Sequence, residues 1–209
     1  MENFYGLFHH ISKVAYDLLF RGDVFGLENL PARGPYLLAS NHCSHLDPPL
    51  LGSQLAEQVR FFARSTLWKP GLPAWWLDRV GTIPVERDSA DIGALKQTIA
   101  TLRNGGIVIL FPEGTRSLDG RLQPPKSGVG MIACKARVPV VPARIFGSFA
   151  AFGRGAKFPR PHPITFVFGR PLPPAAYDDP TAGKQRYQVA SERIMAAIAA
   201  LEPPPLPVV

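Results

Sequence analysis

Segments in which apolar residues recur every three to four positions alternate along the chain with short runs that are almost wholly apolar. The first pattern is typical of amphipathic helices and the second of buried strands. Helices are expected over residues 3–20, 48–57, 89–104, 128–136 and 187–201. Strands are expected over residues 24–27, 35–41, 59–64, 82–85, 106–111, 139–146 and 164–168. This alternation predicts an α/β fold, and the prolines in the strand at 139–146 favour an edge or bulged position for it.

The size and composition of the chain favour one compact domain. It has 209 residues, a usual length for a single core, and 46% of them are hydrophobic, which is enough to fill that core. We divide it into an amphipathic helix at 1–22, a domain at 23–202 and a Pro-rich tail at 203–209. The tail is expected to be a frayed, extended segment, with binding to a polyproline reader as the alternative.

An apolar stripe marks the N-terminal helix. Its members recur three and four positions apart, at Phe4, Leu7, Phe8, Ile11, Val14, Ala15 and Leu18. The stripe would serve either as an interfacial membrane anchor, with Lys13 and Arg21 at lipid headgroups, or as a packing face against the domain. No apolar run reaches the ~18 residues that cross a bilayer, and the start lacks a signal-cleavage pattern, so a peripheral protein is expected.

Trp68, Trp75 and Trp76 form a second apolar group, in a stretch broken by Pro and Gly. Large aromatic residues are most often ordinary packing residues, and the alternatives here are contacts with a membrane interface or the lining of an acyl channel. The sequence leaves these three uses open.

The charge of the chain favours anionic partners. Its formal net charge is +7 and its isoelectric point is near 9.7, which suits nucleic acid, a membrane surface or acidic substrates. The basic residues are dispersed and no zinc-finger or RNA-recognition pattern is present, so we expect a membrane surface and no nucleic acid. The two cysteines lie in unlike contexts, which indicates a reducing, cytosolic setting and no disulfide.

The segment from Asn41 to Pro49, which follows an expected strand, holds a histidine and an aspartate that could share one proton. Five positions apart on one helix, His42 and Asp47 would point about 140° apart, so the chain must bend between them if they touch. Proline at position 48 makes Asp47 a natural N-cap of the next helix. The alternatives are an Asp47 that only caps that helix, a metal site formed with His45, and a nucleophile at Ser44 or at the adjacent cysteine.

A second candidate segment follows the strand at 106–111. Its residues Gly114, Thr115, Arg116 and Ser117 combine a flexible backbone, hydroxyl groups and a planar cation beyond the carboxyl end of a strand, which is typical of an anion site. Phosphate is the anion that we expect. Glu113 would either orient Arg116 or accept a hydrogen bond from a substrate hydroxyl, and the alternative is that these two residues pair across a surface turn.

The two segments together resemble the glycerolipid acyltransferases, specifically the 1-acyl-sn-glycerol-3-phosphate acyltransferase family. The matching motifs are Asn41-His42-x-Ser44-x-x-Asp47 and Phe111-Pro112-Glu113-Gly114-Thr115-Arg116-Ser117. Further blocks appear in the family's order as Gly81-x-Ile83-x-Val85-x-Arg87 and Val138-Pro139-Val140-Val141-Pro142, and residues 26–31 resemble the strand and turn before the first motif. The resemblance covers residues 26–147.

The resemblance implies a fold and a set of site residues. The fold would be a single domain with a mixed, mostly parallel sheet flanked by helices. The catalytic pair would be His42 and Asp47, and the substrate-binding residues would be Arg64, Arg87, Glu113, Gly114, Thr115, Arg116 and Lys126. Family members commonly carry a lysine at the position of Arg64 and a glutamate two residues later, where this chain has Thr66.

The resemblance also implies a reaction at the cytoplasmic face of a membrane. A fatty acyl group would pass from acyl-coenzyme A or acyl carrier protein to the sn-2 hydroxyl of 1-acyl-sn-glycerol 3-phosphate, which gives phosphatidic acid for phospholipid synthesis. His42 would act as the base in a direct transfer that needs no metal and no organic cofactor. The alternatives are another lysolipid acceptor, a transacylase that works without coenzyme A, and a lipid-binding module without catalysis.

Overall fold

The structure, a computed structural model, describes residues 3–65, 68, 74–86 and 91–204, without the side chains of residues 3, 64 and 74–76. Its centre is a seven-stranded sheet in the order β1-β7-β6-β2-β5-β3-β4, in which only the β6–β7 pair is antiparallel among the described strands. The strands are β1 (Val24–Phe25), β2 (Tyr36–Ser40), β3 (Val59–Arg64), β4 (Thr82–Val85), β5 (Ile107–Leu110), β6 (Val140–Phe146) and β7 (Thr165–Phe168). The expected mixed, mostly parallel sheet is thereby confirmed.

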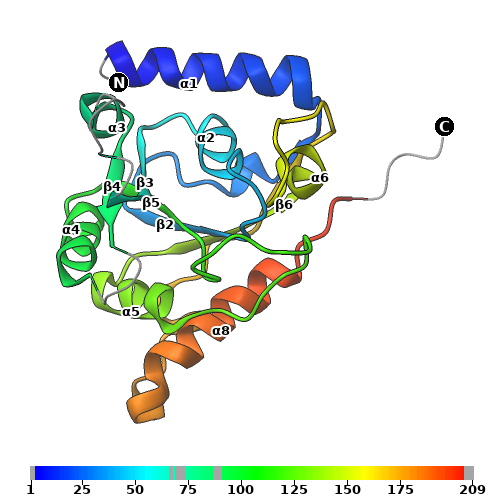
Figure 1. Cartoon of the computed structure of the whole chain (residues 1–209). Helices are drawn as coiled ribbons and strands as arrows, with labels where there is room; N and C mark the ends of the chain where they lie inside the picture. Colours follow the sequence, from blue (N-terminus) through cyan, green and yellow to red (C-terminus); the bar gives the residue numbers. More distant parts are fainter. Residues whose placement is uncertain (1–2, 66–67, 69–73, 87–90, 205–209) are drawn as a thin grey trace.

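Helices cover both faces of the sheet (Figure 1). The helical segments are α1 (Asn3–Ala15), η1 (Tyr16–Phe20), η2 (Leu27–Asn29), α2 (Asp47–Gly52), α3 (Ala74–Arg79), α4 (Ile92–Arg103), α5 (Ser127–Ala136), α6 (Ser148–Phe152), α7 (Pro174–Tyr177), η4 (Pro180–Gln185) and α8 (Arg186–Ala199). Two apolar cores result because side chains alternate between the faces of each strand. One core joins η1 and α2 to the sheet, and the other joins α4, α5 and α8 to its opposite face.

Three details differ from the expectations. The strand with prolines, β6, lies inside the sheet between β7 and β2 rather than at an edge. Proline lacks an N–H, but Pro142 lies opposite Gly169, which is just beyond the end of β7, where the ladder of this pair ends. The Pro142 carbonyl still accepts a hydrogen bond from the Gly169 N–H at 2.8 Å, so proline is tolerated at this position. Helix α2 ends at Gly52 instead of residue 57, and the short helices α3, α6 and α7 have too few residues to show a helical period.

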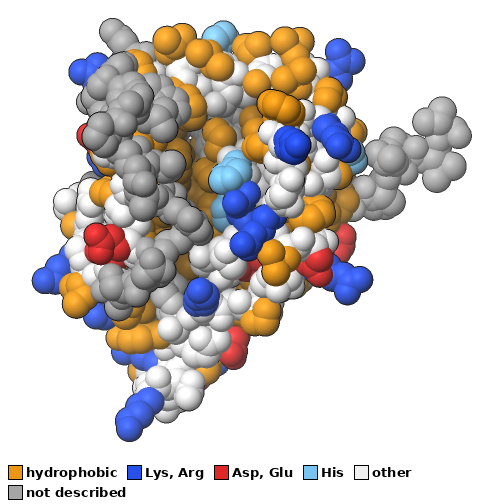
Figure 2. Space-filling model, viewed as in Figure 1, with side chains coloured by type: hydrophobic (Ala, Val, Ile, Leu, Met, Phe, Trp, Pro, Cys, Tyr) orange, Lys and Arg blue, Asp and Glu red, His pale blue; other side chains and the backbone are white. Residues whose placement is uncertain are grey.

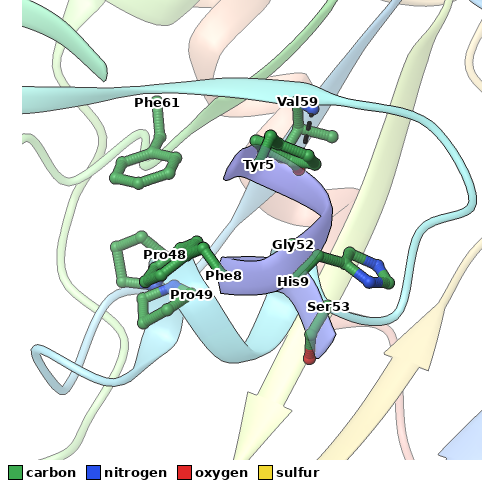
Figure 3. Close-up of a pocket in the computed structure, with 9 residues that line it drawn as sticks. All are labelled: Tyr5, Phe8, His9, Pro48, Pro49, Gly52, Ser53, Val59 and Phe61. Atoms are coloured by element: carbon green, nitrogen blue, oxygen red, sulfur yellow. Dashed lines mark hydrogen bonds between the residues drawn. The ribbon is translucent and has the colours of Figure 1, made fainter. Parts of the chain in front are cut away.

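The N-terminal helix uses two faces rather than one stripe. Tyr5, Tyr16 and Phe20 are buried against the domain, whereas a separate apolar row stays exposed and comprises Leu7, Ile11, Val14, Leu18 and Leu19. Figure 3 shows how the buried face meets α2 and β3, with the Tyr5 hydroxyl accepting a hydrogen bond from the Val59 backbone at 3.1 Å. The gap between these elements is only about 10 Å³, so it is a packing imperfection rather than a ligand site.

None of the described helices has both the length and the apolar character needed to cross a bilayer. The proposed boundaries at residues 22 and 202 remain predictions.

Candidate active site

The register of the sheet brings the two sequence motifs together. Strands β2 and β5 are adjacent and parallel, and Ala39 lies opposite Leu110. His42 lies three residues after Ala39, and Glu113 lies three residues after Leu110. Both residues therefore lie at the same level beyond the carboxyl ends of these two strands. The loops are joined directly, because the His42 N–H donates to Glu113 Oε1 at 3.0 Å and the Ser117 N–H donates to the His42 carbonyl at 2.7 Å.

His42 and Asp47 form the expected pair. His42 Nδ1 lies 2.9 Å from Asp47 Oδ2, and the side chains are 11% and 0% exposed respectively. Since a carboxylate only accepts hydrogen bonds, Nδ1 carries the proton and Nε2 of the neutral ring is left as a proton acceptor. The ring is held flat against Phe111, with centroids 4.0 Å apart and planes 17° apart. The arrangement is that of a positioned general base.

Asp47 does not cap its helix as the sequence suggested. It is the first residue of α2, preceded by Leu46 at the N-cap, and no side-chain cap is formed there. The carboxylate points backwards instead, where Oδ2 accepts the N–H groups of Cys43 and Ser44, each at 2.7 Å. These bonds bend the chain between His42 and Asp47, and they fix the carboxylate that holds the imidazole. The interpretation of Asp47 as a mere cap is therefore wrong.

Glu113 has a structural task that the sequence did not suggest. Its side chain is 2% exposed, and Oε1 accepts the backbone N–H of His42. Burial raises the pKa of Glu113 to about 7, opposed by the backbone N–H groups of His42 and Gln123 and reinforced by the charge of Asp47. Because the side chain is buried and turned toward His42, it ties the second loop to the first and is not half of a surface turn pair.

The expected anion loop lies at this same edge. Gly114 has φ +67°, and a Cβ built there would lie 3.0 Å from Lys126 Cδ, so the Lys126 side chain covers the glycine. The Lys126 N–H also donates to the Pro112 carbonyl at 2.8 Å. Thr115 and Arg116 are half-buried in the loop between Gly114 and Ser117. The structure thus brings Lys126, Gly114, Thr115 and Arg116 onto the loop that is bonded to His42.

Two expected basic residues are less fully placed. Arg64 is the last residue of β3, the neighbour of β5, so its backbone reaches the same edge, but its side chain is outside the described part of the structure. Arg87 follows β4 and belongs to residues 87–90, which the structure does not describe. The side chains of Trp75 and Trp76 are likewise outside the described part, while Trp68 donates from its indole nitrogen to Asp78 at 3.1 Å.

Asn41 is a site residue whose task the sequence motif did not reveal. Its side chain is 3% exposed and forms two hydrogen bonds with the backbone of Ile145, which accepts from Nδ2 at 3.0 Å and donates to Oδ1 at 2.7 Å. An amide offers one acceptor and one donor group in the same arrangement as a backbone peptide unit. Asn41 therefore extends the β2–β6 pairing past the end of the strand and holds the residue before His42 in place.

The alternative chemistries considered for the first motif do not fit this geometry. Ser44 is fully buried, and its hydroxyl donates to the Phe152 carbonyl at 2.8 Å. Burial, with the charges of Asp47 and Glu113, raises the pKa of the Cys43 thiol to about 12, which leaves it a poor nucleophile. Within the described ranges, no three His, Cys, Asp or Glu side chains are grouped so that they could hold a metal ion.

Comparison with known proteins decides the family of this site. The sequence profile of the acyltransferase family, described simply as "Acyltransferase", matches residues 21–146, which include both motifs. The chain belongs to this acyltransferase family. The matched region ends where β6 ends, so it contains the edge of the sheet on which His42, Asp47, Glu113 and Lys126 lie.

Several individual acyltransferases are similar to this chain. A chloroplastic 1-acyl-sn-glycerol-3-phosphate acyltransferase of Brassica napus is 35% identical over 149 residues, which cover 68% of this chain and 43% of that protein. A 1-acyl-sn-glycerol-3-phosphate acyltransferase of Bacillus subtilis is 28% identical, with 86% of this chain and 87% of that protein covered. The chain thus spans less than half the length of the plant relative and most of the bacterial one.

A solved structure supports the same assignment of fold. The crystal structure of a 1-acyl-sn-glycerophosphate acyltransferase from Thermotoga maritima superposes on this chain with a TM-score of 0.72 at 27% sequence identity. The superposition covers 95% of this chain and 81% of that one. The sheet and its flanking helices are therefore an acyltransferase fold over nearly the whole length of the chain.

The surroundings of the acyltransferase motif combine charge with apolar surface. Figure 2 shows histidine side chains in the middle of one face, with Lys and Arg side chains just below them and hydrophobic atoms along the upper edge. A hollow of about 190 Å³ lies between the ends of β3 and β4 and the first turns of α4 and α5, with a mostly apolar lining that includes Phe62, Val85, Leu95 and Met131. Gly128, two residues after Lys126, borders it.

Proposed function

We propose that this protein transfers a fatty acyl group from an acyl thioester to the sn-2 hydroxyl of 1-acyl-sn-glycerol 3-phosphate. The observation that carries the proposal is the direct bonding of the two motifs: the general base His42 is hydrogen-bonded through its backbone to the loop of Glu113, Gly114 and Arg116. An acceptor whose phosphate lies on that loop can bring its hydroxyl to the imidazole. The names of the relatives support this acceptor.

The transfer proceeds directly from donor to acceptor. His42 Nε2 takes the proton of the sn-2 hydroxyl while that oxygen attacks the thioester carbonyl, and Asp47 stabilises the imidazolium that forms. The tetrahedral intermediate then expels the thiolate, which recovers the proton, so the products are phosphatidic acid and the free thiol. A positioned base contributes about 10²- to 10⁴-fold to such a step. The thioester is already activated, so we expect no cofactor.

The phosphate of the acceptor is assigned to the basic groups at the edge of the sheet. Arg116 offers a planar fork for two phosphate oxygens, and Lys126 supplies a compact charge beside Gly114. Arg64 and Arg87 are added on the strength of their sequence positions, at the end of β3 and after β4 respectively. The apolar hollow beside Gly128 is a place for part of an acyl chain.

We further propose that the protein works as a peripheral enzyme at the cytoplasmic face of a membrane. Its acceptor is a lipid, and the exposed row on α1 and η1 offers Leu7, Ile11 and Leu18 to an apolar phase, each more than half exposed. Acyl-coenzyme A and acyl carrier protein are both anionic donors, and the net charge of +7 suits either.

The decisive experiment presents one labelled oleoyl thioester, as coenzyme A or carrier-protein conjugate, with a panel of acceptors. We expect transfer to 1-acyl-sn-glycerol 3-phosphate to exceed transfer to lysophosphatidylcholine, lysophosphatidylethanolamine and lyso-aminolipids. A preference for one of the last three acceptors would show that the proposed acceptor is wrong. Transfer without any thioester would indicate a transacylase. Lipid binding without acyl transfer would refute the proposed enzymatic activity.

Two variants separate the assigned roles. His42→Ala should abolish turnover and leave binding of the acceptor intact, because only the proton acceptor is lost. Arg116→Ala should mainly raise the KM for the acceptor, provided that substrate binding is in rapid equilibrium. Near-normal kcat in the His42 variant would refute the assignment of the base.

A further inference from the structure

The segment between α6 and β7 combines positive charge with an exposed aromatic ring. Its residues 154–163 are all exposed, and they include Arg154, Lys157, Arg160 and Phe158, whose side chain is 77% exposed. The surrounding sequence has no acidic residue anywhere from 120 to 177. A large exposed aromatic side chain flanked by cations, with no carboxylate nearby in sequence, is not explained by packing within the domain.

The segment is braced rather than loose. The Arg160 N–H donates to the Ala151 carbonyl at 2.8 Å, and the Ala156 N–H donates to the Gly153 carbonyl at 3.2 Å. Prolines at positions 159, 161 and 163 fix the backbone φ angles on either side of Arg160. The basic and aromatic side chains are therefore presented from a shaped loop, which lowers the conformational entropy lost when they bind a surface.

This loop lies beside the end of the N-terminal helix. The Ile164 N–H donates to the Phe20 carbonyl at 2.9 Å, and the Tyr16 hydroxyl donates to the Ile164 carbonyl at 2.9 Å. Figure 1 shows the same arrangement, with the yellow segment after α6 rising to the C-terminal end of the long N-terminal helix. The exposed apolar row, whose last members are Leu18 and Leu19, thus ends next to the basic loop.

We propose that residues 154–162 form a second membrane-contact element, which binds anionic lipid headgroups through Arg154, Lys157 and Arg160 and inserts Phe158 beneath them. This inference deepens the peripheral location proposed above and rests on it. The loop also connects to the catalytic motif, because the Ser44 hydroxyl donates to the Phe152 carbonyl at the end of α6. Contact through both the helix and the loop would fix the orientation of the site toward the lipid surface.

An anionic membrane fits this surface better than the other acidic partner of such an enzyme, a carrier protein. Cations at headgroup level and an aromatic ring just below them match the layered polarity of a bilayer interface. The adjacent row of Leu and Ile side chains needs an apolar phase that continues over the helix and the loop, and an acidic protein surface does not supply one.

The test measures binding to vesicles by co-sedimentation of the full chain. Vesicles of phosphatidylcholine are compared with vesicles in which part of the lipid is phosphatidylglycerol. The variant R154Q/K157Q/R160Q should lose affinity for the anionic vesicles by about tenfold or more, since each basic residue near such a surface contributes about fivefold. Its binding to phosphatidylcholine should not change, whereas Phe158→Ser should weaken binding to both.

The matched control is K96Q/K135Q/K184Q, which removes the same amount of charge from the other face of the sheet, where α4, α5 and α8 lie. This control should bind vesicles like the wild type. Thermal unfolding of all variants should coincide, because the substituted side chains are exposed. Unchanged binding of R154Q/K157Q/R160Q to anionic vesicles would overturn the inference alone. A raised KM of that variant for an acyl carrier protein donor, with vesicle binding unchanged, would assign the loop to the carrier instead. A wild type that binds neither vesicle would overturn the peripheral location itself.

Discussion

At the scale of single residues, the site depends on buried polar groups whose partners come from distant parts of the sequence. Asp47 accepts hydrogen bonds from the His42 ring and from two backbone N–H groups, and Glu113 accepts one from the His42 backbone. Both side chains are nearly inaccessible to water. Such bonds are strong where the accepting carboxylate is ionised, and the loss of either partner leaves a buried group unsatisfied.

The variant Glu113→Gln tests how much the burial of the Glu113 carboxylate lowers the stability of the folded protein. The folded state raises the pKa of Glu113 to about 7, whereas the unfolded chain titrates near the ordinary value of about 4.3. Between these values the folded protein holds a proton that the unfolded chain has lost, so stability falls as pH rises. Glutamine keeps an acceptor for the His42 N–H and does not titrate. Relative to this variant, the wild type should lose at most about 3 to 4 kcal/mol of unfolding free energy from pH ~4 to ~8.

Urea unfolding across this pH range provides the measurement. The exposed carboxylate variant Glu28→Gln is the control and should follow the wild-type pH profile. Parallel curves for wild type and Glu113→Gln would show that the buried carboxyl titrates normally.

At the scale of elements, helices α5 and α8 approach closely and support the loop of the site from below. The Gly130 N–H donates to Ser191 Oγ at 2.8 Å, and that hydroxyl donates to the Lys126 carbonyl at 2.8 Å. A Cβ at Gly130 would lie 2.0 Å from the Tyr187 carbonyl oxygen. The contact between the two helices therefore requires glycine at this position, and it fixes the backbone of the lysine that covers Gly114.

Gly130→Ala should consequently destabilise the protein. The added methyl group would overlap a backbone carbonyl, so the two helices must move apart to accommodate it. We expect this to lower the free energy of unfolding by about 1 to 3 kcal/mol. Gly128→Ala is a matched control on the same helix, since a Cβ there meets nothing within 4 Å. That variant should be unchanged or stabilised by up to about 1 kcal/mol through its helix propensity. Equal melting temperatures for the two variants would contradict the packing argument.

At the scale of the whole molecule, the N-terminal helix lies on one face of the domain with one side packed and the other exposed. Tyr5, Tyr16 and Phe20 attach it to the core, and the row from Leu7 to Leu19 faces outward. The two uses that the sequence left open, core packing and a surface for lipid, are therefore compatible in one helix. An exposed apolar row of this length indicates a surface that meets a further apolar phase.

The variant Leu7→Gln/Ile11→Gln/Leu18→Gln should lower the affinity of the protein for lipid vesicles by at least about tenfold, because apolar area that would enter the interface becomes polar. Co-sedimentation gives the affinity, and circular dichroism should show an unchanged fold, since the replaced side chains are exposed. Leu27→Gln, at an exposed leucine on η2, is the control and should bind like the wild type. Undiminished binding of the triple variant would remove this row from the membrane contact.

The sequence by itself determined most of the elements and singled out the residues of the His42–Asp47 pair, to which we assign the proton transfer. Hydrophobic periods are local properties, so they located all seven described strands and the long helices. The His42-to-Asp47 spacing and the loop from Glu113 to Ser117 likewise lie within single short segments. They could be recognised without knowing what packs against them.

Only the tertiary structure decided what depends on contacts between segments far apart in the chain. The register of β2 against β5 brings the Glu113 carboxyl within hydrogen-bond distance of the His42 N–H. Pro142 can lie inside the sheet because β7 ends opposite the residue that follows it. The backward turn of Asp47 and the pairing of Asn41 with Ile145 are of the same kind. A local pattern specifies which residues are apolar or ionisable, but the free energy that selects their partners arises only when the whole sheet is assembled.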